Sequence, residues 1–234
     1  MYNNAIIDFD RVYSKAYSVL FKNKGEETMI GYYNYTVILT YIGTLFGFAG
    51  ITYIGSGNLR MALLCLMFAG FCDMFDGKIA STMKRTKQEK RFGIQIDSLS
   101  DLICFGVLPA LIVFQFSDKK VLPVFISGLY LLCALIRLAW FNVDEEERQD
   151  GQMGSRETYL GLPVTSSALL LPLFIGTVQL LSLPVGALAP WLLCAIAVAF
   201  ITPFRLKKPG NMGKVILLLL GVAALVVVIV GVKI

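Results

Sequence analysis

Long apolar runs alternate with short polar segments along most of this chain. A helix that crosses the hydrocarbon core of a membrane needs about 20 mostly apolar residues, because it rises only about 1.5 Å per residue. Seven stretches meet this requirement, namely 37–55, 59–80, 93–116, 121–142, 161–181, 184–203 and 214–232. The pattern therefore predicts an all-α integral membrane protein, a polytopic helical bundle of about seven (six to eight) transmembrane helices.

The segment before the first apolar run has a different pattern. Its apolar residues recur at roughly helical spacing and are interleaved with Arg11 and Lys15. This arrangement predicts an amphipathic helix on the membrane surface, and a solvated terminal helix is the other interpretation. Early acidic residues and the lack of a sufficiently long apolar core are not typical of a signal peptide. We thus expect a juxtamembrane segment, 1–30, and one membrane domain, 31–234.

The composition agrees with a membrane protein and removes several kinds of chemistry. Hydrophobic residues make up 56% of the chain, charged residues only 16%, and the mean hydropathy is +0.70. A soluble domain carries about 25% charged residues. Histidine is absent, which excludes a histidine general base, a Ser–His–Asp triad and zinc sites with imidazole ligands. The five cysteines lie in apolar runs without paired spacing, so we expect small buried thiols rather than disulfides or clusters.

Lysines and arginines are distributed unequally between the two sets of loops, and such asymmetry sets the orientation of membrane proteins. One side holds fifteen of them, in the amino-terminal segment and in the loops after the second, fourth and sixth spans. The other side holds only Arg60, Lys119, Lys120 and Lys233. The richer side is expected in the cytoplasm of a multi-pass cell-membrane protein, where anionic lipid headgroups rather than nucleic acid balance the net charge of +5. The acidic run 144–150 is expected to form a solvated loop.

Four of the sixteen acidic residues fall inside apolar spans: Asp73, Asp76, Asp97 and Asp101. An ionised carboxylate at mid-bilayer costs about 2.5–3.5 kcal/mol, so four without compensation cost on the order of 10 kcal/mol. Lys78 and Arg137 are the only basic residues well inside spans, which is too few to pair with them. Because hard divalent cations prefer carboxylate oxygens, the four acids predict a site for two metal ions.

The spacing of these acids favours one shared site. Asp97 and Asp101 are four residues apart, and Gly93 precedes Asp97 by four, so all three share one helical face. Asp73, Asp76, Gly77 and Ala80 similarly share a face of the preceding helix. A twelve-residue loop, 81–92, allows the two helices to form an antiparallel hairpin whose small residues leave room for a nucleotide or phosphate. Close packing of two helices through the same small residues is the alternative.

These residues also carry a family resemblance. The segment Asp73-Met-Phe-Asp76-Gly77-Lys-Ile-Ala80, followed by Gly93-Ile-Gln-Ile-Asp97-Ser-Leu-Ser-Asp101, resembles the CDP-alcohol phosphotransferase signature, D-x-x-D-G-x-x-A-R, a spacer and G-x-x-x-D-x-x-x-D. Seven of its eight fixed residues are present. The likeness extends from about residue 30 to 165 and includes NYTVILTY (34–41), DSLSDLICFGVLPALI (97–112), IRLAWFNV (136–143) and YLGLPV (159–164).

The resemblance implies a divalent-metal-dependent enzyme that transfers a phosphatidyl group from a CDP-linked lipid to an alcohol and releases CMP. It is closest to the family members that use CDP-diacylglycerol and L-serine, and it implies a homodimer among membrane lipids. Asp73, Asp76, Asp97 and Asp101 are implied ligands of Mg²⁺ or Mn²⁺, with Asp101 also the catalytic general base. Gly77 and Ala80 resemble positions beside the cytidine, and Asn34 and Thr36 are further candidates for nucleotide binding.

Two features depart from the signature. Ser81 stands where the family has an arginine near the substrate's diphosphate, and the spacer before Gly93 is longer than in the common form. Lys78, Lys84 or Arg85 are the cations available to replace that arginine, and reduced activity is the competing expectation. The basic segment 84–91 is expected to attract the nucleotide, although its role in orientation explains it equally well.

The acceptor alcohol and the general function each have an alternative. Serine's carboxylate requires a cation, for which Arg137 is the candidate with Asn142 beside it, although Arg137 also suits a lipid headgroup. Glycerol phosphate, inositol phosphate or an archaeal lipid substrate would fit the same signature. A cation transporter also has intramembrane acids, but it predicts acids spread over several spans and an internal repeat, neither of which the sequence has.

Overall fold

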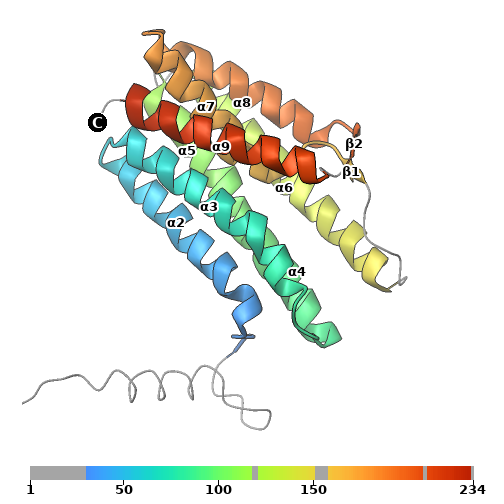
Figure 1. Ribbon diagram of the computed structural model, residues 1–234. Helices are drawn as coiled ribbons and strands as arrows, with labels where there is room; N and C mark the ends of the chain where they lie inside the picture. Colours follow the sequence, from blue (N-terminus) through green and yellow to red (C-terminus); the bar gives the residue numbers. More distant parts are fainter. Residues whose placement is uncertain (1–29, 118–120, 151–157, 208–209, 233–234) are drawn as a thin grey trace, which may run out of the picture.

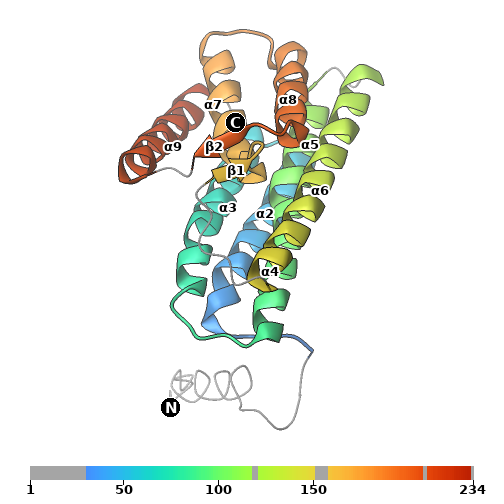
Figure 2. The ribbon, with the colours of Figure 1, turned by 90° about the vertical axis from the view of Figure 1, so that its right-hand side faces the viewer.

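The computed structural model describes residues 30–117, 121–150, 158–207 and 210–232. In this part of the chain the protein is a bundle of helices that run roughly along one common direction (Figures 1 and 2). The first pair comprises α2 (Ile38–Gly55), preceded by the 3-10 turn η1 (Tyr35–Val37), and α3 (Leu59–Ala80). The third apolar run contains α4 (Lys87–Asp101), the π-helical segment η2 (Leu102–Val107) and α5 (Leu108–Phe116).

The carboxyl-terminal half adds four helices and a small sheet. The long helix α6 (Val121–Asp150) leads to β1 (Thr158–Leu160), the turn η3 (Val164–Ser166) and α7 (Ser167–Leu180). Helix α8 (Val185–Ile201) is followed by β2 (Arg205–Lys207) and α9 (Asn211–Gly231). The strands are antiparallel, with Tyr159 opposite Leu206, and so hold the start of α7 and the end of α8 together.

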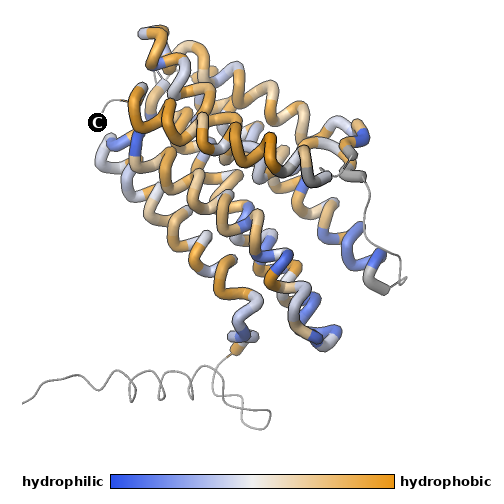
Figure 3. The backbone as a smooth tube through the Cα atoms, viewed as in Figure 1, coloured by the Kyte–Doolittle hydropathy of each residue, from blue (hydrophilic) through white to orange (hydrophobic). Residues whose placement is uncertain are grey.

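Each predicted apolar stretch falls on a helix of the bundle, so the all-α membrane character of the prediction is confirmed. Three helical segments meet length and hydropathy criteria for crossing a membrane, namely Tyr35–Gly55, Lys87–Phe116 and Val121–Arg148. Shorter apolar helices are Val164–Leu180, Val185–Ile201 and Val215–Gly231. Apolar residues cover the body of the bundle, whereas polar residues gather where α4 begins and α6 ends (Figure 3).

Glycines on α2 allow close packing against α3, η2 and α5. A Cβ atom added at Gly47 would lie 2.6 Å from the Cys104 Sγ atom, and one at Gly50 would lie 2.8 Å from the Leu108 side chain. Small residues at such positions allow membrane helices to approach each other and gain van der Waals contact. The core below them contains the fully buried side chains of Leu63, Leu66 and Leu108. All five cysteines are free thiols and four are buried, as expected.

Three boundaries differ from the sequence expectations. The acidic run 144–150 is not a loop but the last part of α6, because Arg148 hydrogen-bonds Glu145 within the helix and Glu146 accepts a hydrogen bond from Gln95 of α4. The 81–92 loop is shorter than expected, since α4 already begins at Lys87. The fifth apolar run, 161–181, does not begin as a helix, because Gly161 has a φ of +71° and the helical residues start only at Val164. The predicted amphipathic helix lies outside the described residues.

Candidate active site

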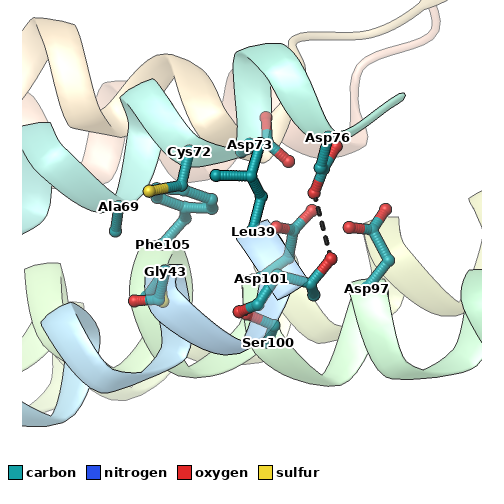
Figure 4. Close-up of a pocket in the computed structure, with 12 residues that line it drawn as sticks. Leu39, Gly43, Ala69, Cys72, Asp73, Asp76, Asp97, Ser100, Asp101 and Phe105 are labelled. Atoms are coloured by element: carbon teal, nitrogen blue, oxygen red, sulfur yellow. Dashed lines mark hydrogen bonds between the residues drawn. The ribbon is translucent and has the colours of Figure 1, made fainter. Parts of the chain in front are cut away.

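The four carboxylates predicted to form one site lie together where α3 ends and α4 approaches η2 (Figure 4). Oxygen atoms of Asp73, Asp97 and Asp101 lie within 4.8 Å of one another. Three carboxylates at this separation match the ligand set of a hard divalent cation. In the described chain none of the four acids is in an ion pair with a lysine or arginine. The donor set therefore fits a metal ion better than it fits a structural salt-bridge network.

Helix α2 forms a third wall of this site. The Thr40 hydroxyl donates a hydrogen bond of 3.3 Å to Asp76 Oδ2. The hydroxyls of Thr44 and Ser100 are 2.7 Å apart and share a hydrogen bond, which ties α2 to the helix that carries Asp101. The pocket between the three segments is lined by Leu39, Thr40, Gly43, Ala69, Cys72, Asp73, Asp76, Asp97, Ser100, Asp101, Cys104 and Phe105.

The two glycines of the signature have different surroundings. A Cβ atom added at Gly77 would meet nothing within 4 Å, so this exposed face of α3 beside Asp76 is open. A Cβ atom at Gly93 would lie 3.0 Å from an Arg85 guanidinium nitrogen. Gly93 therefore provides the space in which the Arg85 side chain lies over the first turns of α4.

The end of α3 shows how Ser81 and its neighbouring cations are arranged. Ser81 is exposed, and its hydroxyl donates a hydrogen bond of 2.6 Å to the Lys78 carbonyl. The hydroxyl therefore caps the end of α3 and does not contact the acids. Lys78 is exposed with its Nζ atom 5.9 Å from the Phe75 ring, and Lys84 is also exposed. Arg85 is half-buried, and its Nε atom is buried without a hydrogen-bond partner in the described chain. Among these three cations, Arg85 is the one whose side chain lies beside the signature, at Gly93, which is one turn before Asp97.

The remaining nucleotide candidates lie at the same end of the bundle but outside the pocket lining. Asn34 caps η1, with its side-chain oxygen accepting hydrogen bonds from the backbone and hydroxyl of Thr36. Between them Tyr35 shares a hydrogen bond of 3.0 Å with Thr82, just after Ser81. Ala80 is half-buried on the last turn of α3. Asn34 and Thr36 thus have a structural role at the start of the first membrane helix.

The two acceptor candidates occupy different surroundings on α6. Asn142 accepts a hydrogen bond of 2.5 Å from Ser98, the residue after Asp97, so it lies against the acidic helix. Arg137 is buried, with 6% of its surface exposed, and its Nε atom donates to the Leu162 carbonyl at 3.4 Å. Its guanidinium group also stacks within 6 Å of Trp140. Asn142 therefore lies near the acidic cluster, whereas Arg137 lies beside the loop before α7.

A match to a model of a known protein family identifies the family of this chain. A family model described as CDP-alcohol phosphatidyltransferase matches residues 33–232, which include every residue of the acidic site. The chain belongs to the CDP-alcohol phosphatidyltransferase family. The expected family is thereby confirmed.

Individual members of this family are similar to parts of the chain. An archaetidylserine synthase of Methanothermobacter thermautotrophicus is 27% identical over 177 residues, 75% of this chain and 70% of that protein. A CDP-diacylglycerol–serine O-phosphatidyltransferase of Saccharomyces cerevisiae is 34% identical over 143 residues, 56% of this chain and 51% of that protein. A Helicobacter pylori protein of the same name is 28% identical over 60% of this chain and 56% of its own length. The matched region thus spans only about half of the yeast and H. pylori relatives.

Sequence reasoning missed the polar residues that α2 contributes to the site. Thr40 and Thr44 are four residues apart, so they share one face of a largely apolar helix. This spacing could have indicated a contact with another helix, because a hydroxyl in a membrane helix usually needs a hydrogen-bond partner. Ser100 also went unnoticed, although it directly precedes Asp101.

Proposed function

We propose that this family member transfers the phosphatidyl group of CDP-diacylglycerol to L-serine and so produces phosphatidylserine and CMP. The observation that carries this proposal is the convergence of Asp73, Asp76, Asp97 and Asp101 from two helices at the signature positions. The names of the similar proteins, which specify serine transfer or a serine lipid, support serine as the acceptor.

The reaction exchanges one phosphorus–oxygen bond for another. The serine hydroxyl oxygen forms a bond to the phosphorus of the phosphatidyl group, and the bond from that phosphorus to the oxygen of CMP breaks. CMP leaves with the electron pair of the broken bond, so no oxidant or further energy source is needed. The hydroxyl proton passes to a carboxylate, for which Asp101 is our candidate because it lies in the pocket and the chain contains no histidine.

The carboxylates are also our proposed metal ligands. Asp73, Asp97 and Asp101 are close enough to share an ion, and Asp76 is oriented by Thr40 at the edge of the same pocket. Magnesium or manganese bound there would supply positive charge to neutralise the diphosphate and the transferring phosphoryl group. The chain's own contribution is to hold the four oxygen donors on two rigid helices.

The nucleotide and diphosphate are proposed to lie along the open side of α3. Gly77 and Ala80 present no side-chain bulk there, which supports close approach of the cytidine, while Gly93, Ser81, Lys84, Asn34 and Thr36 lie at the same end of the bundle. Arg85 is our candidate for the cation that Ser81 does not provide, because its guanidinium lies beside Gly93 and retains an unpaired buried nitrogen. A guanidinium suits phosphate oxygens through its forked donors.

Serine is proposed to enter between α4 and α6. Asn142 is hydrogen-bonded to the residue that follows Asp97, so an amide group is available close to the metal ligands. Arg137 is a buried cation on the same helix and is our candidate for the serine carboxylate. We further propose that all seven apolar helices cross the cell membrane, that the acidic site opens to the cytoplasm, and that the protein is a homodimer.

Release of CMP from CDP-diacylglycerol by the purified protein tests the function. L-serine, glycerol phosphate and inositol phosphate are offered separately, with Mg²⁺ or Mn²⁺ present. The proposal predicts CMP and phosphatidylserine in equal amounts with L-serine alone. CMP release with a different alcohol instead would retain the chemistry and reject serine, and no release with any alcohol would reject the function.

A further inference from the structure

The helix that carries Asp97 and Asp101 changes its hydrogen-bonding pattern directly after Asp101. Residues Leu102–Val107 form a π-helical segment, and the Leu108 N–H group bonds to the Ile103 carbonyl, five residues earlier. Such segments in long helices have an identifiable cause and often accompany functional sites. This one separates the two metal-ligand candidates on α4 from the buried helix α5.

Pro109 explains why the α-helical pattern fails here. In an α-helix the Phe105 carbonyl would accept a hydrogen bond from the N–H group of residue 109, but proline has none and its ring crowds that carbonyl. The Phe105 carbonyl therefore lacks its α-helical donor at a depth where water is scarce. A buried carbonyl without any partner would be costly.

Two side-chain hydroxyls from other helices meet this carbonyl. The Tyr130 hydroxyl of α6 donates to the Phe105 oxygen at 2.5 Å, and the Ser167 hydroxyl at the start of α7 lies 3.4 Å from it. Both residues are completely buried. Ser167 also lies 2.9 Å from the Val164 oxygen, so its proton is shared between two carbonyls. Gly106 permits this close approach, because a Cβ atom there would lie 3.3 Å from the Leu131 side chain of α6.

The π segment determines how Asp101 is directed relative to the core. Helix α5 is fixed by Leu108 and Ile112, which are fully buried. One residue more or fewer in the intervening turn rotates everything before it by about 100°, the angle between successive residues of an α-helix. A return to the α-helical pattern would thus rotate Asp97 and Asp101 away from Asp73, with which they form the carboxylate cluster.

We infer that Tyr130 and Ser167 are positioning residues for Asp101, acting through the Phe105 carbonyl and the π segment. Their hydroxyls satisfy the carbonyl that Pro109 leaves without a donor and thereby hold the register in which Asp97 and Asp101 face Asp73. This inference rests on the proposed function of the acidic site. It assigns no contact with substrate to either residue.

The test compares Tyr130→Phe, which removes one hydroxyl, with Ser127→Ala as the matched control. Ser127 is a buried α6 residue one turn earlier whose hydroxyl has no hydrogen-bond partner in the described chain. Mn²⁺ binding to the full chain in detergent is measured by electron paramagnetic resonance, which does not depend on turnover. We expect Tyr130→Phe to weaken Mn²⁺ binding about tenfold and to lower kcat about 10- to 100-fold, because small displacements of reacting groups have large effects. The KM for CDP-diacylglycerol should stay within about twofold, since no substrate contact is lost.

Ser127→Ala should bind Mn²⁺ and turn over as the unmodified protein does. Tyr130→Phe combined with Ser167→Ala should lose more Mn²⁺ affinity than Tyr130→Phe alone, and if the double variant does not fold, Tyr130→Phe decides. Unchanged Mn²⁺ affinity in Tyr130→Phe, or an equal loss in Ser127→Ala, would overturn the positioning role. If the unmodified protein forms phosphatidylserine while Tyr130→Phe is normal, only this inference fails. If it forms no CMP with any alcohol, the proposed function fails, and the Mn²⁺ comparison still tests the positioning role.

Discussion

The Thr40 hydroxyl on α2 donates a hydrogen bond to the Asp76 carboxylate on α3 across the candidate active site. Asp76 is the acid outside the cluster of three carboxylate oxygens, and the three acids of that cluster come from α3 and α4. Thr40 therefore extends a site made by two helices onto a third. Its backbone carbonyl also lies 3.4 Å from the Ser100 hydroxyl, next to Asp101.

Replacing Thr40 by valine tests whether this third helix contributes to catalysis. Valine retains the shape of threonine but cannot donate, and hydrogen bonds to charged groups contribute about 1.5–3 kcal/mol. We expect kcat/KM to fall about tenfold or more, since each 1.4 kcal/mol corresponds to a factor of ten. Thr52→Val is the matched control, because the Thr52 hydroxyl donates to the Ala49 carbonyl near the far end of α2. Equal CMP release by both variants would contradict a role for Thr40.

Substitutions of Asp97 and Asp101 should remove different functions of the site. Asp97→Ala deletes a proposed ligand and should abolish turnover and weaken Mn²⁺ binding. Asp101→Asn keeps an oxygen but cannot accept the serine proton, so turnover should fall about 10²- to 10⁴-fold while much CMP binding remains. Mn²⁺ titration and equilibrium binding of CMP measure these losses, with Asp144→Asn on α6 as the control. Full activity of either site variant, or of the protein after exhaustive chelation, would exclude the proposed metal site.

Much of the arrangement of these acids followed from the sequence. The seven apolar runs predicted the helices because a membrane interior requires a long apolar helix, and the four-residue spacing of Asp97 and Asp101 predicted a common face. The site's connection to α2 did not follow, because it depends on how α2 packs against the helix bearing Ser100. The start of α4 could have been predicted, because Thr86 and Glu89 form a capping box. The charged composition of the segment instead suggested a loop.

The candidates for the cation that would bind the diphosphate could be reduced from three to one only with the structure. The sequence offered Lys78, Lys84 and Arg85 equally, since all three lie near Ser81. Packing distinguishes them because Lys78 and Lys84 are exposed, whereas the Arg85 guanidinium lies beside Gly93. The acidic end of α6 is likewise helical, and besides the local Arg148–Glu145 pair it has a hydrogen bond from Gln95 of α4, a long-range contact that no local pattern indicates.

Arg85→Ala is therefore expected to lower activity more than alanine at Lys78 or Lys84. The loss should be about 10- to 100-fold in kcat/KM, the value of one arginine contact to a charged group. Ser81→Arg should change little by itself and should restore activity in the Arg85→Ala background, because a guanidinium would then occupy the signature position. CMP release at saturating metal is the measurement. Silent alanine substitutions at all three cations would show that no cation is needed there.

The orientation of the bundle can be tested with single cysteines in a background without the five native ones. Gln88→Cys, on the first turn of α4, should resist an impermeant thiol reagent in intact cells, because the basic residues around it predict a cytoplasmic location. Ser56→Cys, after α2 at the opposite end, should react and serves as the control. Labelling of Gln88→Cys from outside would reverse the orientation and the side on which the site opens.

The most direct measurement of the central claim is CMP release from CDP-diacylglycerol by the purified protein, with L-serine and Mg²⁺ or Mn²⁺. The account predicts one phosphatidylserine for each CMP, no reaction after chelation and none with Asp97→Ala, since the carboxylates of α3 and α4 are the proposed metal ligands. CMP release that is independent of metal and persists in Asp97→Ala would contradict the assignment of this site.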